Sequence, residues 1–235
     1  MTDLLVNVAK RPFFLRGAFA AVLIGIVVGN FALRGTRAAD AFSPDLSKVT
    51  TQWKVPAPAG DKQAVFAGGC FWAMQAEFSE LKGVDRVVAG YAGGTTADPT
   101  YDKVTTETTG YAETVRIDYN PATISYKQLL NVFFRVHDPT TLDRQGDDVG
   151  TSYRSIAFYE NPAQETATKD VIAQVNASHV YNSRVVTEVL PFTKFYQAED
   201  YHQNFAVHNP DEGYVAYTVV PEVARFRARF KPLLK

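Results

Sequence analysis

The stretch QAVFAGGCFWAM, from Gln63 to Met74, contains the only cysteine of the chain and decides how its first two elements are joined. The short apolar run Gln63–Ala67 predicts a strand that ends at two glycines. Beyond Cys70, apolar residues recur at helical spacing until Gly83 stops the pattern: Phe71, Met74, Phe78 and Leu81. We therefore expect Cys70 at the turn from a strand into a helix.

The position of Cys70 makes it a candidate nucleophile. A lone cysteine is by default a small buried hydrophobe. Here, however, Gly68 and Gly69 allow a sharp turn, and the unpaired amides and the dipole of the first helical turn stabilise a thiolate. Phe71 and Trp72 read as core residues of the helix, but beside a nucleophile an exposed aromatic ring could instead form an apolar wall for a methyl or thioether group.

The remaining segments indicate an α+β fold. Strand patterns cover Val84–Tyr91, a half-buried run through Val115, Ile117 and Tyr119, and the segments Arg154–Tyr159 and Val185–Leu190. Helix patterns run from a capping box of Ser125 and Gln128 to His137, and from Pro162 to about Asn176. This β-α-β-β-α-β order with a further helix and strand predicts a ferredoxin-like mixed sheet with helices packed against one face and long functional loops.

The composition excludes several classes of function. With 24 basic and 25 acidic residues, the net charge of -1 gives no electrostatic footprint for nucleic acid. A single cysteine excludes an intramolecular disulfide and a multi-thiolate metal site, and His202 and His208 lack the partners that a metal would need. We expect no bound metal or cofactor, a monomer, and a solvated basic terminus from Arg225 to Lys235.

The first 41 residues predict an export leader. Basic residues precede the apolar run Gly17–Leu33, and Ala39-Asp40-Ala41 is a cleavage site of the A-x-A kind. The run is as long as a short membrane span, so an uncleaved anchor is the alternative. A buried helix of a cytosolic protein is the third interpretation. Residues 42–60 are rich in Pro, Ser and Ala and predict a linker. Residues 61–235 then form the catalytic domain, in the periplasm or on the outer face of the membrane.

Gly69-Cys70-Phe71-Trp72, followed by Glu77, resembles the catalytic signature of the A-type peptide methionine sulfoxide reductases, with Ala73 where the family has Gly. The added methyl group of Ala73 is expected to narrow substrate access near Trp72. Further family segments follow in order between Lys62 and Pro221: Gly90–Gly94, Asp98–Tyr101, Thr109–Glu113, His137–Pro139, Arg144–Asp148, Gly150–Ser155 and Ala198–Gln203.

The resemblance implies reduction of methionine (S)-sulfoxide, free or in oxidised proteins, which repairs oxidative damage. Carried over by position, Cys70 is the nucleophile, Glu113 the general acid, and Phe71 and Trp72 the binding wall for the substrate methyl group. The residues implied to assist at the sulfoxide oxygen are Tyr101, Asp148 and Tyr153.

The residue pattern bears on two of these roles. Glu113 lies two residues before Val115 and four before Ile117, so in a regular strand its side chain points to the same apolar face. The alternative is that it turns into solvent, as a glutamate at a strand end commonly does. If it is buried, desolvation raises its pKa and keeps a proton available near neutral pH. The segment Asp138–Ser152 has no periodicity; long connections of this kind tend to be functional, and the alternative is a solvated loop.

The chain departs from its many relatives that carry extra cysteines near the C-terminus, because it has none. A sulfenic acid on Cys70 must therefore be resolved by an external thiol, such as glutathione, glutaredoxin or thioredoxin. Three other classes stay open on the residues alone: a single-cysteine peroxidase, a cysteine hydrolase, and a noncatalytic exported binding domain in which Cys70 is structural.

Overall fold

The computed structural model describes residues 53–235. The strands are β1 (Lys62–Ala67), β2 (Val84–Ala92), β3 (Ala112–Tyr119), β4 (Arg144–Gln145), β5 (Asp148–Val149), β6 (Ile156–Tyr159), β7 (Glu188–Pro191) and β8 (Phe195–Gln197). The α-helices are α2 (Phe71–Ser79), α3 (Tyr101–Val104), α4 (Tyr126–Val136), α5 (Pro162–Ser178), α6 (Phe205–His208) and α7 (Val220–Phe230). Shorter helical turns are η2 (Thr151–Tyr153), η3 (Asp200–His202), η4 (Val215–Val219) and η5 (Lys231–Leu233).

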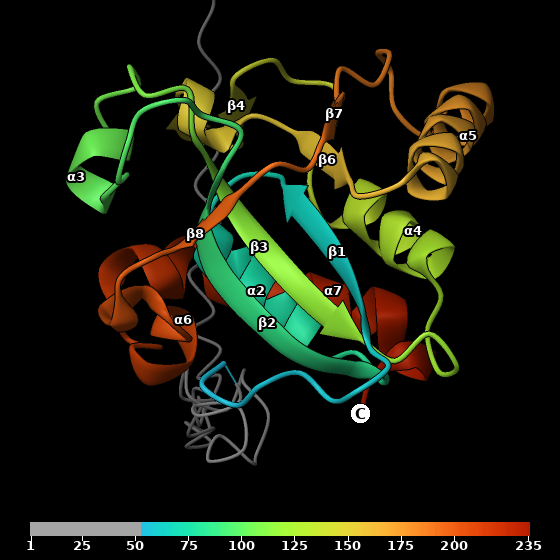
Figure 1. Cartoon of the computed structure of the whole chain (residues 1–235), viewed down its shortest axis with the longest axis horizontal. Helices are drawn as coiled ribbons and strands as arrows, with labels where there is room; N and C mark the ends of the chain where they lie inside the picture. Colours follow the sequence, from blue (N-terminus) through green and yellow to red (C-terminus); the bar gives the residue numbers. More distant parts are fainter. Residues whose placement is uncertain (1–52) are drawn as a thin grey trace, which may run out of the picture. The chain divides into compact units, whose positions relative to one another are not determined.

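The main sheet confirms the predicted α+β class. Its strand order is β7-β6-β1-β3-β2-β8 (Figure 1). Within the order β6-β1-β3-β2, each strand is antiparallel to the next, and helices α2 and α4 make the two crossovers, which is the ferredoxin-like arrangement. Strand β7 then adds parallel to β6, and β8 adds antiparallel to β2, so the complete sheet is mixed.

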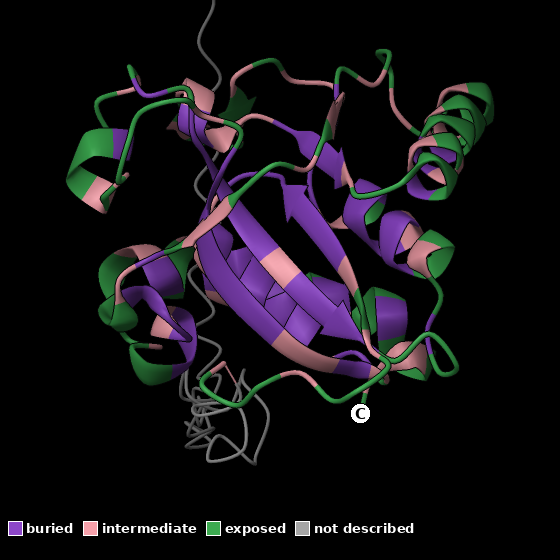
Figure 2. Cartoon of the chain, viewed as in Figure 1, coloured by how far each residue is buried: buried purple, intermediate pink, exposed green. Residues whose placement is uncertain are grey.

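The principal core lies between the sheet and helices α2, α4 and α7. Phe66 from β1 stacks on Phe133 of α4 with ring centroids 4.7 Å apart, and Phe78 of α2 packs beside them. Helix α4 begins with the predicted capping box, in which Ser125 and Gln128 each satisfy the other's backbone N–H. In Figure 2 the buried colour runs along β1, β2 and β3 and over α2 behind them.

The prediction that β3 is half buried is wrong, because its second face is covered as well. Asp118 on that face is fully buried and accepts hydrogen bonds from Gln63 and Arg86, while Arg116 lies over the ring of Phe195 at 5.1 Å. The alternation of apolar and charged residues marked the core face correctly. On the other face, Arg86 of the neighbouring strand β2 neutralises Asp118, and the ring of Phe195 covers Arg116; the sequence of a single strand reveals neither partner.

The basic C-terminus is not a solvated tail either. Phe226 and Phe230 of α7 are buried in the principal core, four residues apart on one helical face. Beside them Arg227 donates two hydrogen bonds to Glu80, at 2.7 and 2.5 Å. The aromatic residues interleaved with the arginines therefore dock this segment onto the end of α2.

The predicted leader, residues 1–41, and the linker up to residue 52 lie outside the described residues. The described end of the linker, residues 53–60, contains turns and no helix or strand. Between residues 53 and 235, no helix combines the length and the apolar character needed to cross a bilayer.

Candidate active site

Cys70 is the residue at which β1 passes into α2, as the sequence predicts. It is the N-cap of α2, and its carbonyl oxygen accepts the first helical hydrogen bond, from Met74. The turn needs a glycine before it, because Gly69 has φ +96° and an added Cβ would lie 2.5 Å from the side chain of Gln145. The hairpin that carries Gln145 can thus approach closely over Cys70.

One cavity of about 280 Å³ is lined by all seven residues that the resemblance implicated. They come from different parts of the fold: the start of α2, the start of α3, strand β3, strand β5 and the turn η2. Between Asp138 and Ser152, where no regular structure was expected, the chain forms the two-stranded hairpin β4–β5. This hairpin holds Asp148 at the rim of the cavity, so the segment is more ordered than its sequence indicates. The seven residues are Cys70, Phe71, Trp72, Tyr101, Glu113, Asp148 and Tyr153.

Glu113 is buried and points to the cavity, as its parity with Val115 predicts. Only 2% of it is exposed, and its Oε2 accepts a hydrogen bond of 3.0 Å from the backbone N–H of Phe71. Burial raises the pKa of Glu113 to about 8; the Phe71 hydrogen bond opposes this rise, and the carboxylates of Asp148 and Glu107 add to it. The side chain therefore carries a proton at neutral pH.

The Cys70 thiol is only partly exposed. Desolvation and the adjacent Glu113 carboxyl together raise its pKa well above the ordinary value. The backbone N–H groups of Trp72 and Ala73 act in the opposite direction, which is the helix-terminus effect expected from the sequence, but burial outweighs them. The pair Cys70 and Glu113 thus resists carrying two negative charges, and neutral Glu113 is the state that favours the thiolate.

Tyr101 and Tyr153 supply two phenol groups to the same cavity. Burial raises the pKa of Tyr101 to about 12 and that of Tyr153 further, so both hydroxyls keep their protons and can donate. Tyr101 is anchored through its backbone N–H, which donates to Glu199 Oε1 at 3.0 Å. Glu199 Oε2 in turn accepts from the hydroxyl of Tyr91 at 2.9 Å, which fixes the start of α3 against β2.

An aromatic wall forms one side of the cavity. Trp72 stacks on Phe205 with ring centroids 4.0 Å apart, and its indole N–H donates to His202 Nδ1 at 3.2 Å. His202 is buried, as one of the readings of this residue expected, and its ring also packs against Phe71 and Tyr101. Because Nδ1 accepts, His202 is in the tautomer that carries its proton on Nε2.

Sequence reasoning missed Tyr214 and Glu212, which also line the cavity. The Tyr214 hydroxyl donates to Asp148 Oδ2 at 2.6 Å and lies within hydrogen-bonding reach of the Cys70 thiol, whose pKa it lowers. Burial and the neighbouring Cys70 and Asp148 charges keep Tyr214 protonated. No periodic pattern marks this tyrosine, because it belongs to a segment that meets Cys70 only through the long-range fold.

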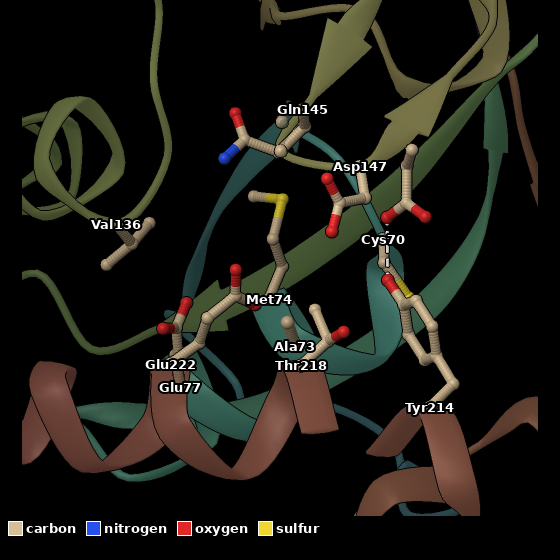
Figure 3. Close-up of a pocket in the computed structure, with 13 residues that line it drawn as sticks. Cys70, Ala73, Met74, Glu77, Val136, Gln145, Asp147, Tyr214, Thr218 and Glu222 are labelled. Carbon is tan, nitrogen blue, oxygen red and sulfur yellow. Dashed lines mark hydrogen bonds between the residues drawn. The ribbon is translucent and has the colours of Figure 1, made fainter. Parts of the chain in front are cut away.

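A second, smaller pocket of about 40 Å³ (Figure 3) shares Cys70, Asp148 and Tyr214 with the larger cavity. Figure 3 shows Glu77 of α2 and Glu222 of α7 side by side at one end of it, and the ring of Tyr214 beside Cys70 at the other. Burial raises the pKa of both glutamates, that of Glu222 to about 7. The Glu222 carboxyl group raises the pKa of Glu77 further, Asp148 raises that of Glu222, and Arg225 lowers both. Ala73 lines this pocket and not the larger cavity.

The Ala73 methyl group therefore does not narrow the substrate side. It is 6% exposed and packs with Val215 and Val219 of η4 and Val223 of α7. We expect Ala73→Gly to lower the free energy of unfolding by about 1–2 kcal/mol, since it loses a buried methyl group and helix propensity. The KM for a sulfoxide substrate should stay within about twofold, a smaller change than the loss of one typical hydrogen bond to the substrate would cause, because Ala73 does not line the larger cavity.

Urea unfolding and steady-state kinetics on the same preparations measure both effects. The matched control is Ala224→Gly in α7, where the alanine is exposed and only helix propensity is lost. A large change in KM with unchanged stability would contradict the placement of Ala73 away from the substrate.

Residues 62–233 match the family model described as peptide methionine sulfoxide reductase. Several relatives named peptide methionine sulfoxide reductase MsrA share nearly half of their residues with the chain. The protein from Chromobacterium violaceum is 47% identical over 174 residues, which are 74% of this chain and 99% of the relative. That from Picrophilus torridus is 48% identical over 164 residues, 70% of this chain and 92% of the relative.

Solved structures show the same similarity. Mxr1 from Saccharomyces cerevisiae in its reduced form superposes with a TM-score of 0.62 at 33% identity and covers 66% of this chain and 88% of its own. Methionine sulfoxide reductase A of Corynebacterium diphtheriae gives a TM-score of 0.59 at 32% identity, covering 65% of this chain and 77% of its own. The similarity thus extends through the part of the chain that builds the cavity.

Proposed function

Because the chain belongs to the peptide methionine sulfoxide reductase family, we propose that it reduces methionine (S)-sulfoxide, free or in proteins, with Cys70 as nucleophile and Glu113 as general acid. The observation that carries this proposal is the shared cavity. A partly exposed thiol at a helix N-terminus and a buried, protonated carboxyl group line the same space, and the first turn of α2 connects them. Sulfoxide reduction needs these two groups together.

The first chemical step transfers the oxygen atom. Cys70 Sγ attacks the sulfoxide sulfur while Glu113 gives its proton to the sulfoxide oxygen, and the thiol proton returns to Glu113. Methionine leaves, and the oxygen remains on Cys70 as a sulfenic acid, so sulfur in the substrate is reduced and Cys70 is oxidised. Tyr101 and Tyr153 donate hydrogen bonds to the oxygen as negative charge develops on it, with Asp148 holding Tyr214 close by.

The geometry of the cavity supports selection of one epimer. A sulfoxide sulfur carries an oxygen, a methyl group and the longer substituent in a fixed chiral order. The proton donors fix the oxygen, the wall of Phe71 and Trp72 holds the methyl group, and Cys70 fixes the direction of attack. Only one epimer can satisfy these requirements with its chain directed to solvent.

Two external thiols complete the cycle. The first condenses with the sulfenic acid to give a mixed disulfide and water, and the second releases Cys70 as a thiol and leaves an external disulfide. We propose that the donor is glutathione, a glutaredoxin or a thioredoxin-like protein, because Cys70 is the only cysteine of the chain.

An assay with the separate epimers of methionine sulfoxide and a small thiol tests the function. We expect turnover of the S epimer alone, with one methionine formed for each external disulfide. Equal reduction of both epimers would exclude the proposed specificity for the S epimer. Consumption of hydroperoxide in place of sulfoxide would exclude the proposed reaction and favour the peroxidase alternative.

We propose further that residues 1–41 export the enzyme or anchor it on the outer side of the membrane, since a basic segment, an apolar run and an A-x-A site follow one another there. Oxidised methionines of envelope proteins would then be its substrates. N-terminal sequencing of protein isolated from cell fractions distinguishes cleavage after Ala41 from an intact anchor, and recovery of the intact chain from the cytosol would refute export.

A further inference from the structure

Glu107 has a backbone conformation that a glutamate rarely adopts. Its φ is +63°, in the left-handed region, at the turn that follows α3. A non-glycine residue there carries a steric cost, and such residues persist only where the surrounding structure holds them. The contacts of the side chain show what holds Glu107.

The Glu107 carboxylate reaches across to the segment before Tyr153. Its Oε2 accepts a hydrogen bond of 2.8 Å from the Thr151 hydroxyl and another of 2.8 Å from the Ser152 backbone N–H. Its Oε1 accepts from the Ser152 hydroxyl at 2.6 Å. Ser152 is 1% exposed, so its hydrogen bonds to a carboxylate are sheltered from water.

The carboxylate acts as a cap for the turn η2. The N-cap position of η2 is Gly150, which has no side chain to satisfy the first N–H groups. A side chain at that position would displace the cap, because an added Cβ would lie 2.5 Å from the Glu107 carboxyl group. At the other end of the turn, Arg154 donates to the carbonyl oxygens of Thr151 and Gly110. The segment is thereby tied to residues 107–110 at both ends.

We propose that Glu107 is a positioning residue, which caps the turn Gly150–Tyr153 from across the cavity rim and so holds the Tyr153 hydroxyl at the place where the sulfoxide oxygen is reduced. The inference rests on the proposed function, in which Tyr153 donates to that oxygen. Glu107 itself does not line the cavity. Glu107 acts through its hydrogen bonds to Ser152, which fix the backbone of the turn and thereby the orientation of the Tyr153 side chain.

A second effect of Glu107 is electrostatic. Burial and the charge of Asp148 raise the pKa of Glu113, and the hydrogen bond from Phe71 lowers it. The charge of Glu107 adds a smaller rise. Removal of the Glu107 charge therefore moves the loss of the Glu113 proton to lower pH. A purely structural residue would leave that pH unchanged.

The test compares Glu107→Gln, Glu107→Gly and Ser152→Ala with the wild-type chain. Gln keeps the length of the side chain and one acceptor, whereas Gly relieves the left-handed backbone and removes the cap. We expect Glu107→Gly to lower kcat about tenfold, the size expected when hydrogen bonds to a charged group are lost, with KM within about twofold. The effect falls on kcat because the Tyr153 donor acts most strongly as charge develops on oxygen.

Glu107→Gln should lose less of kcat and should move the basic limb of the pH–kcat profile to lower pH. The combined Glu107→Gln and Ser152→Ala variant should lose less than the product of the two single losses, since both remove the same contact. His179→Gly is the matched control, because His179 is exposed and has a similar left-handed backbone, with φ +51° at the end of α5. Removing the steric strain at this position should leave kcat and the pH profile unchanged.

Wild-type kcat in Glu107→Gly, or single losses that multiply fully in the double variant, would overturn the inference while leaving the proposed function intact. Retained reduction in Cys70→Ser would instead overturn the proposed function. Should Glu107→Gly fail to fold, as judged by its thermal transition, the Glu107→Gln kinetics and pH profile decide the matter alone.

Discussion

Replacement of Cys70 by serine is expected to lower kcat/KM for methionine (S)-sulfoxide by about 10⁴-fold or more, the scale on which removal of a catalytic nucleophile acts. A serine hydroxyl stays protonated in this buried site and forms no stable bond to the sulfoxide sulfur. The remaining cavity still binds the substrate, because Phe71, Trp72 and Glu113 are unchanged. Steady-state assays with a dithiol reductant measure the loss.

Trp72 allows binding to be followed separately from turnover. The chain has two tryptophans, so Trp72 is the only one left in a Trp53→Phe background. Addition of the S epimer to Cys70→Ser in that background should still change the fluorescence of Trp72. Turnover by this variant at more than a trace of the wild-type rate would show that Cys70 is not the nucleophile, and would favour a binding module in which it is structural.

A single turnover of the wild-type chain without reductant provides the positive counterpart. One equivalent of methionine should form, and the intact protein should gain the mass of one oxygen atom on Cys70. A small thiol added afterwards should convert this species to a mixed disulfide. Methionine formed alongside unmodified Cys70 would contradict the mechanism, as would an acylated Cys70 with an ester substrate, which belongs to a hydrolase.

The parts of the site that depend on local order in the chain could be predicted from the sequence. The turn before α2 follows from two glycines between a strand pattern and a helix pattern, and it puts Cys70 at a helix N-cap. The inward direction of Glu113 follows from its spacing to Val115, and 2% exposure bears this out. Both features are set within a few residues, where periodicity is informative.

The parts that depend on contacts between distant segments could not be predicted. Tyr214 meets Asp148 across 66 positions of sequence, in a segment without a pattern. Likewise the net effect on the Cys70 thiol depends on how much water the whole fold removes, which the helix terminus alone does not determine. The docking of α7 was missed because its arginines suggested solvent, while Phe226 and Phe230 between them determine the packing.

Replacement of Glu113 by glutamine is expected to slow sulfoxide reduction by about 10²–10⁴-fold, the usual contribution of a general acid. Gln keeps the shape and can still accept the hydrogen bond from Phe71, but it has no acidic proton to give. In the wild-type chain, Glu113 has a pKa of about 8, raised above its ordinary value, so it is protonated below pH 8. The wild-type rate should therefore fall as the pH rises through about 8, and this limb should be absent in Glu113→Gln.

Alkylation of Cys70 by iodoacetamide should respond in the opposite direction, because it needs a thiolate and no acid. Above pH 8 the wild-type Glu113 is charged and raises the pKa of the neighbouring thiol, whereas Gln is neutral. At pH 9 the Glu113→Gln variant should thus be alkylated faster than wild type while it reduces sulfoxide more slowly. Glu77→Gln, which removes a buried carboxyl group outside the larger cavity, is the control and should slow reduction far less. If Glu113→Gln changes both rates in the same direction, Glu113 acts on the thiol and not as the proton donor to the sulfoxide oxygen.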